Sequence, residues 1–206
     1  MSKQLISCIA ILAWCAMVSA QDRQPKKPTH PELQQELKQR VKLDQDARFA
    51  MIELSKKPQS EKTDQMKLIE KVSKIDSENT AWLKGIVDKQ GWPTISMVGS
   101  DGAQAAWLLV QHADAKPAFQ RQCLDLMDKL PKTEVHGKNL AYLTDRVLIA
   151  EGKKQRYGTQ FSQVNGEWKP RPMENEAEVD KRRAEIGLST MAEYVKQLEK
   201  TYGSKK

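Results

Sequence analysis

The segment 103-AQAAWLLVQH-112 decides the fold, because it is apolar on nearly every side when it is wound as a helix. Gln104 and Gln111 are its polar residues before it ends at His112. A helix that is hydrophobic all round offers no face to water and is usually buried by its neighbours. The segment therefore predicts a helix at the middle of a bundle.

Helical periodicity continues on both sides of this segment. Before it, one helix is expected from Pro31 to Lys56, and a second from Thr63 to Lys89, where the 91-GWP-93 break ends it. After it, helices are expected at residues 117–130, 138–150, 177–186 and 190–202. These patterns predict about six to seven helices.

One β-hairpin is expected near residues 157–170. Asn165-Gly166 is a strong hairpin signal, because both residues tolerate the positive φ angles of a type I′ turn. Tyr157, Thr159, Phe161 and Val164 lead toward it with strand-like alternation. The fold class is therefore mainly α: a single-domain helical bundle with one small hairpin.

The chain start predicts export. Lys3 precedes an almost wholly apolar run, and small residues end at Ala20, as signal peptidase requires. We expect a signal peptide at 1–20, a disordered basic linker at 21–31 and one α-rich domain at 32–203, located in the periplasm or outside the cell. The apolar run is short for a membrane span, so no stable span is expected after cleavage. Cys15 leaves a lipoprotein as the rival interpretation, although Trp14 is bulky for a lipobox.

Charge and cysteine content argue against a nucleic-acid-binding protein and against a protein stabilised by intrachain disulfides. The formal charge is +7, but much of it lies at the two ends of the chain, so a nucleic-acid partner is not expected. Cleavage after Ala20 leaves Cys123 as the one cysteine, so no intrachain disulfide can form. Cys123 has helical spacing with apolar neighbours and is expected to be a small buried hydrophobe.

Polar residues interrupt two predicted apolar faces. Asp44 and Arg48 lie within the first helix's apolar arc, formed by Leu33, Leu37, Val41, Leu43, Ala47, Met51 and Leu54. Asp76 and Asn79 lie within the second helix's face, formed by Ile69, Val72, Ile75, Leu83, Ile86 and Val87. A buried carboxylate must be paired or hydrogen-bonded. Either these residues form internal pairs, or the two faces meet round a polar pocket.

His112, preceded by Gln111 at the end of the central helix, is the candidate acid–base residue. Histidine ordinarily titrates near neutral pH, which suits proton transfer. Asp145 and Arg146 lie at the edges of the apolar face of the helix at 138–150, where a salt bridge or an anion-binding role would explain them. No metal-ligand spacing, Walker loop, nucleophile elbow or dinucleotide fingerprint is present, so we expect no metal site and no cofactor.

Several motifs follow one another along the chain: Asp76-x-x-Asn79, Gly91-Trp92-Pro93, Ala105-Ala106-Trp107, Gln111-His112-Ala113-Asp114, Leu140 to Val147, and Gly152-x-x-Gln155-x-Tyr157-Gly158-Thr159-Gln160. In this order they resemble those of a bacterial family of unknown function, over roughly residues 37 to 195. The resemblance implies no activity, ligand or cofactor.

The motif with Gln155, Tyr157 and Gln160 carries more polar groups than a hairpin needs. Amides and a phenol suit hydrogen bonding to a small polar ligand such as a peptide or sugar. Our hypothesis is a cleft in which this strand forms one wall and the floor is formed by His112, Asp76, Asn79, Asp44 and Arg48. The alternative is that these amides only tie the strand to the helices.

Two functions remain open from the sequence. One is a metal-independent hydrolase or transferase in which His112 transfers protons, Asp76 or Asp145 orients it, and Arg48 or Arg146 stabilises negative charge. The other is a non-catalytic binding module for a peptide, glycan or partner protein. A purely structural protein is a third possibility, and it would need no concave polar pocket.

Overall fold

The computed structural model describes residues 27–55, 62–165 and 167–202. Its helices are α1 (Pro31–Ser55), α2 (Lys62–Gln90), α3 (Ile95–Gln111), α4 (Pro117–Asp128), α5 (Gly137–Ala150), α6 (Val179–Glu185) and α7 (Met191–Tyr202), with a 3-10 turn at Glu176–Glu178. The strands β1 (Phe161–Val164) and β2 (Glu167–Pro170) form an antiparallel pair. The predicted fold class is confirmed. The predicted signal peptide and most of the linker lie outside the described residues.

The central position predicted for the apolar segment is confirmed. Eight residues of α3 are buried, among them Val98, Ala106 and Val110. The helix begins earlier than expected, because the Thr94 side chain accepts a hydrogen bond from the Met97 backbone N–H and caps it. Gly99 bends the helix with a φ of 72°, and a Cβ there would lie 2.9 Å from the Gln34 side-chain nitrogen of α1.

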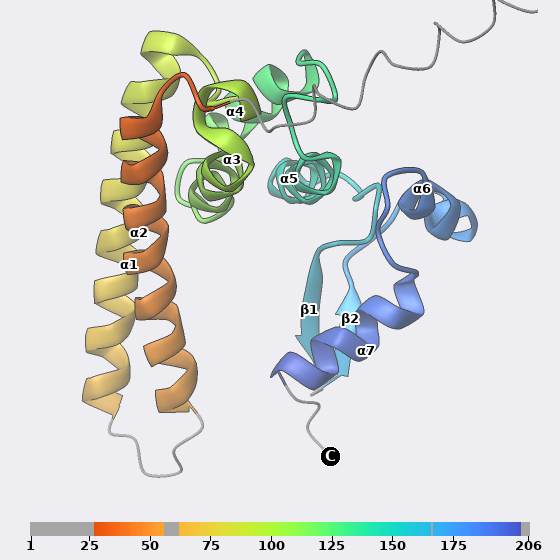
Figure 1. Cartoon of the computed structure of the whole chain (residues 1–206). Coiled ribbons are helices and arrows are strands. Elements are labelled where there is room, and N and C mark those ends of the chain that lie inside the picture. The colour runs from red at the N-terminus through yellow and green to blue at the C-terminus, as the bar shows by residue number, and fades with distance from the viewer. Residues whose placement is uncertain (1–26, 56–61, 166, 203–206) are drawn as a thin grey trace, which may run out of the picture.

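Figure 1 shows α1 and α2 side by side as a long antiparallel hairpin, with α3, α4 and α5 packed near one of its ends. The β-hairpin, α6 and α7 lie on the other side of α5. Edge-to-face aromatic contacts connect the two sides, from Trp107 of α3 through Tyr142 and Tyr194 to Phe161 of β1.

The core contains Cys123, which is fully buried as predicted. Burial raises the pKa of its thiol, so the sulfur stays protonated and unreactive. Two residues assigned to the core from periodicity are exposed: 62% of Leu43 and 57% of Ile69 is accessible to solvent. The far half of the α1–α2 hairpin extends beyond α3, and no third helix among the described residues covers it (Figure 1).

The hairpin begins later than its alternating pattern indicated. The antiparallel register runs from Phe161 opposite Pro170 to Val164 opposite Glu167. Tyr157 and Thr159 were expected to start the strand, but their backbone N–H groups donate to the Asp145 carboxylate instead of to a neighbouring strand. In the described residues, no helix is both long enough and apolar enough to cross a membrane.

Candidate functional site

The centre of the site is a histidine–carboxylate pair between α1 and the end of α3. His112 Nδ1 lies 3.1 Å from Asp44 Oδ1 and 3.0 Å from Oδ2. Gln45 Nε2 donates to Asp44 Oδ2 at 2.7 Å. Asp44 is 1% exposed, whereas 18% of the His112 side chain remains exposed. A buried carboxylate therefore holds a histidine that still reaches the surface.

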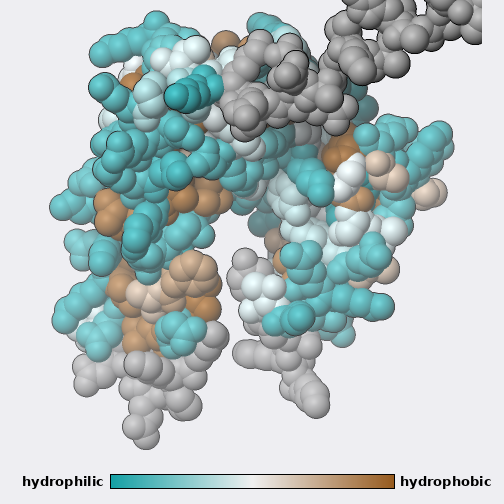
Figure 2. Space-filling model, viewed as in Figure 1, coloured by the Kyte–Doolittle hydropathy of each residue, from teal (hydrophilic) through white to brown (hydrophobic). Residues whose placement is uncertain are grey.

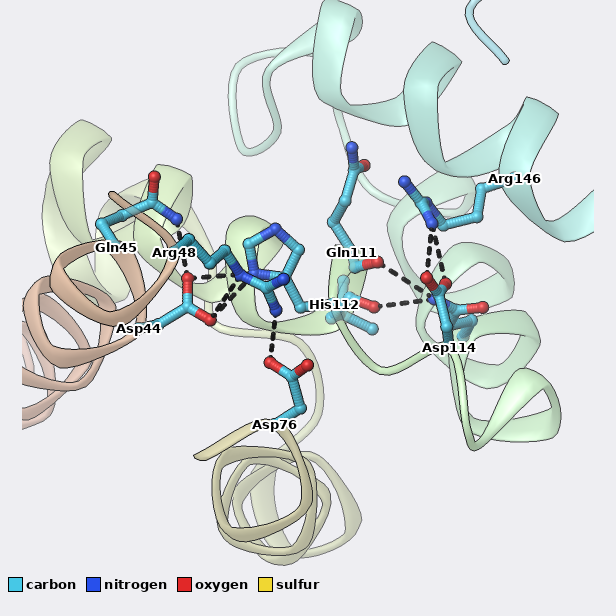
Figure 3. A network of polar contacts seen from close by, with 10 residues as sticks. Asp44, Gln45, Arg48, Asp76, Gln111, His112, Asp114 and Arg146 are labelled. Carbon is cyan, nitrogen blue, oxygen red and sulfur yellow. Dashed lines mark hydrogen bonds and ion pairs between the residues drawn. The ribbon is translucent and has the colours of Figure 1, made fainter. Parts of the chain in front are cut away.

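Arg48 connects this pair to α2. Its Nε donates to Asp44 Oδ1 at 3.1 Å, and its Nη2 donates to Asp76 Oδ1 at 2.5 Å. Figure 3 shows Arg48 beside the His112 ring with the two carboxylates on different sides of its guanidinium. The polar residues that interrupted the apolar faces of α1 and α2 thus meet, and the structure brings together Asp44, Arg48, Asp76 and His112.

The two carboxylates have opposite pKa shifts. Burial by itself raises the pKa of Asp44, but hydrogen bonds from His112 and Gln45 and the charge of Arg48 outweigh it, so the pKa lies below its usual value. Burial raises the pKa of Asp76 above its usual value, and the nearby Arg48 cation only partly opposes this. Two carboxyl groups whose pKa values are shifted in opposite directions can have different protonation states in one site.

A pocket of about 960 Å³ adjoins these residues. It lies between one face of α2 and the turn that joins α3 to α4, with Arg48 and Met51 contributed by α1. Its polar lining includes Arg48, Asp76, Ser77, Thr80, His112 and Lys116. Its apolar lining includes Met51, Ile69, Val72, Ala113, Pro117 and Phe119.

Asp44, Asp76 and His112 also form a potential metal-ligand set, because one ligand atom from each lies within 4.8 Å of the others. No spacing in the sequence indicates this set, because Asp44 lies in α1, Asp76 lies in α2 and His112 follows the end of α3. In the structure, Arg48 is ion-paired with both carboxylates, so a metal cation would have to displace its guanidinium from Asp44 and Asp76.

The turn that carries His112 is held by α5. Arg146 Nη1 donates to both Asp114 oxygens at 2.8 Å, and Gln120 Nε2 donates to Asp114 Oδ1 at 3.0 Å and to the Gln111 backbone oxygen at 3.3 Å. Figure 3 shows the Gln111 side chain pointing away from Asp44 and Asp76. Arg146 and Gln111 were predicted as binding residues, and here Arg146 binds Asp114 and Gln111 binds Gln120, so both support the turn that carries His112. Gln120 was missed, because an amide within an amphipathic helix gives no distinctive signal.

Asn79 lies one helical turn beyond Asp76, but it does not line the pocket. Its Oδ1 accepts a hydrogen bond from Arg40 Nη1 at 3.2 Å, and the Arg40 guanidinium stacks 4.3 Å above the Trp82 ring centroid. Asn79 is 6% exposed and therefore ties α2 to α1 behind the site.

Asp145 lies apart from His112 and organises the loop before the hairpin. Its carboxylate accepts hydrogen bonds from the backbone N–H groups of Arg156, Tyr157 and Thr159 and from the Thr159 hydroxyl, at 2.7–3.2 Å. Asp145 is 0% exposed. Asp145 was one of two residues expected to orient His112, but the residue that binds the His112 ring is Asp44.

The predicted wall of the cleft also lies elsewhere. Gln155 is fully buried, and its side chain bonds only backbone groups: it donates to the oxygens of Gln160 and Arg171 and accepts from the Gln160 N–H. Gln160 Nε2 donates to the Thr159 hydroxyl. Tyr157 lines a different pocket, between α4, α5, the loop before the hairpin and the end of α6. These residues do not share the pocket of His112, because Asp145 pulls their loop onto α5.

Comparisons with known proteins agree with the resemblance seen in the motifs. No curated protein and no solved structure matches the chain. The model of a family of unknown function, DUF6624, matches residues 31–206, a range that contains every helix and strand described above. The chain is therefore a member of this family of unknown function.

Proposed function

We propose that the protein is an enzyme, a hydrolase or transferase in which His112 is the proton-transfer group. The observation that carries the proposal is the orientation of one histidine. Asp44 binds Nδ1, Nε2 has no hydrogen-bond partner among the described residues, and the side chain lines a pocket. A carboxylate on Nδ1 favours the tautomer with its proton on that nitrogen, which leaves Nε2 as the basic atom.

The other charged groups fit this role. His112 Nε2 would accept a proton from water or from an acceptor hydroxyl as its oxygen attacks the substrate, and would return that proton to the leaving group. Arg48 supplies a cation beside the reacting centre, and Asp76, whose pKa burial raises above its usual value, supplies a second carboxyl group bonded to that cation. No step is assigned to a metal, because the Arg48 guanidinium occupies the space between the carboxylates that would bind one.

Replacement of His112 tests this proposal. Chromogenic carboxylic esters, phosphate esters, amides and glycosides would be screened with the wild type, and the best substrate then measured with His112→Ala. We expect kcat/KM to fall on the order of 10²-fold or more, as is usual for loss of a general base. His30→Ala is the matched control, since His30 is exposed and absent from the pocket lining. Equal activity of His112→Ala and His30→Ala would rule out the proposed role.

A non-catalytic binding module is the second candidate. The observation in its favour is that Arg48 and Asp44 are already satisfied by partners within the protein, as in a structural network. Such a module would bind a ligand in the same pocket, and no substrate of the panel would turn over above the rate of His112→Ala.

We also propose that the protein acts outside the cytoplasm after cleavage at Ala20. The support is the sequence of the chain start: a basic residue, an apolar run and small residues before Gln21. Protein recovered from the periplasm or medium of a bacterial host should have Gln21 as its first residue by N-terminal sequencing. Full-length chain confined to the cytoplasm, or a lipid-modified Cys15, would contradict this proposal.

A further inference from the structure

The pocket of His112 continues as a groove along α2. Its α2 lining includes Ile69, Val72, Asp76, Thr80 and Lys84, which recur every three to four residues and therefore lie on one face. At 1.5 Å per residue, this face extends about 22 Å. Asp76 lies near its middle, where Arg48 connects it to the Asp44–His112 pair. The site therefore accepts an elongated molecule, with the acid–base residues partway along it.

One end of this groove is apolar and uncovered. Met51, Ile69 and Val72 line it, and Ile69 is 57% exposed. Met66, next on the same helix, is 69% exposed. Figure 2 shows hydrophobic residues gathered on the half of the α1–α2 hairpin that extends away from the other helices. Hydrophobic residues this exposed beside a pocket mark a surface that binds an apolar group.

The cations that line the groove beyond its apolar end favour an acidic group next to that apolar part. Arg48 is paired with Asp44 and Asp76, and Lys84 is paired with Asp88. Lys116 lines the same pocket and has no carboxylate partner among the described residues. A ligand that brings a negative charge to Lys116 would supply that partner.

We infer that the substrate is an acyl-chain compound with a negatively charged polar head, an inference that rests on the proposed function. The chain lies along Met51, Ile69 and Val72, and the head lies beside His112 and Lys116. A hydrocarbon chain fits better than a peptide, because these three side chains offer no hydrogen-bond donors to backbone carbonyl groups. The distance along α2 from Ile69 to Asp76 is about 10 Å, which suits a chain of medium length.

Isothermal titration with sodium decanoate tests this assignment, because decanoate has both the chain and the acidic head. We expect decanoate to bind the wild type and butanoate and decyltrimethylammonium to bind far more weakly. Ile69→Ser should weaken decanoate binding by about tenfold, as for loss of a partly buried side chain. Lys116→Gln should weaken it by about threefold, as for loss of an exposed ion pair.

Matched controls remove the same groups outside the groove. Val164→Ser replaces an exposed apolar residue of β1, and Lys71→Gln replaces an exposed lysine on the outer side of α2. Both should leave the affinity for decanoate unchanged. No binding by the wild type, equal effects of Ile69→Ser and Val164→Ser, or tighter binding of an apolar hexapeptide would overturn the inference. Sedimentation of wild type and Ile69→Ser detects another occupant: a lower mass for the variant with unchanged decanoate affinity would identify the face as an interface between copies and would also overturn it.

His112→Ala separates this inference from the proposed function. The variant should still bind decanoate, since the chain contacts are intact, while losing turnover of any substrate found in the ester panel. Decanoate binding without any dependence of turnover on His112 would refute the enzyme and leave the ligand class standing. Turnover that depends on His112, with no decanoate binding, would refute the ligand class alone.

Discussion

Asp145→Ala is expected to lower the free energy of unfolding by about 3–5 kcal/mol, the range seen when one partner of a buried charged network is removed. The Asp145 carboxylate is 0% exposed and accepts hydrogen bonds from three backbone N–H groups and one hydroxyl. Its loss would leave several of these donors unpaired away from water, each at a substantial cost. Urea denaturation followed by far-ultraviolet circular dichroism measures the change.

The control for Asp145→Ala is Asp125→Ala on α4. Asp125 is exposed and has a weak ion pair with Arg121 at 3.5 Å, so its removal should change stability little. Asp145→Asn should lie between the two, because an amide keeps one acceptor oxygen but places donors opposite backbone N–H groups. If Asp145→Ala and Asp125→Ala unfold at the same urea concentration, the carboxylate does not hold this loop.

The role of Asp145 was not predictable from the sequence. The periodicity of α5 placed Asp145 at the edge of an apolar face, which is compatible with a salt bridge or a catalytic role. Its actual partners are the N–H groups of residues 156–159, and every residue has a backbone N–H whatever its side chain. The use of a carboxylate as an anchor for a loop therefore leaves no pattern in the sequence. The amide of Gln155 is a further example, because its side chain also bonds only to backbone groups.

More of the His112 site than of the Asp145 loop could be predicted from the sequence. Asp44, Arg48 and Asp76 interrupt apolar faces, and a charged group in such a position must find a partner on another element. That requirement left two possibilities: internal pairs among these residues, or a polar pocket where the faces of α1 and α2 meet. It could not identify Asp44 as the residue that orients His112, because 68 residues separate them and the choice depends on how α3 crosses α1. The exposure of Ile69 was not predictable either. Helical periodicity identifies the apolar face of α2, but it does not show which other element packs against that face.

Arg48→Met is expected to destabilise the protein by about 3 kcal/mol at pH 7.5, because it leaves the Asp44 and Asp76 carboxylates near each other without the cation between them. Methionine keeps much of the apolar stem of arginine, so the change chiefly removes the charge and its donors. Lys42→Met on the same helix is the control: it also removes one cation from an i,i+4 ion pair, with Asp46, but 74% of the Lys42 side chain is exposed. The control should lose little stability.

The effect of pH distinguishes repulsion between carboxylates from a simple loss of packing. The pKa of Asp76 is already raised in the folded wild type, with Arg48 opposing the rise, so removal of Arg48 should raise it further. A carboxyl group whose pKa is higher in the folded state binds more protons there than in the unfolded state, so stability falls as pH rises through the folded pKa and is regained as pH falls. The deficit of Arg48→Met relative to wild type should therefore shrink between pH 7.5 and pH 5.

The double variant Arg48→Met/Asp76→Asn tests whether repulsion between carboxylates is the cause, because it removes the cation together with one of the two carboxylates that pair with it. It should be more stable than Arg48→Met at pH 7.5, and its deficit relative to wild type should depend less on pH. A pH-independent deficit in Arg48→Met, with no recovery in the double variant, would mean that Arg48 contributes through packing and not as the link between two carboxylates. The opposite pKa shifts of Asp44 and Asp76, on which the acid–base assignment partly rests, would then need a different cause.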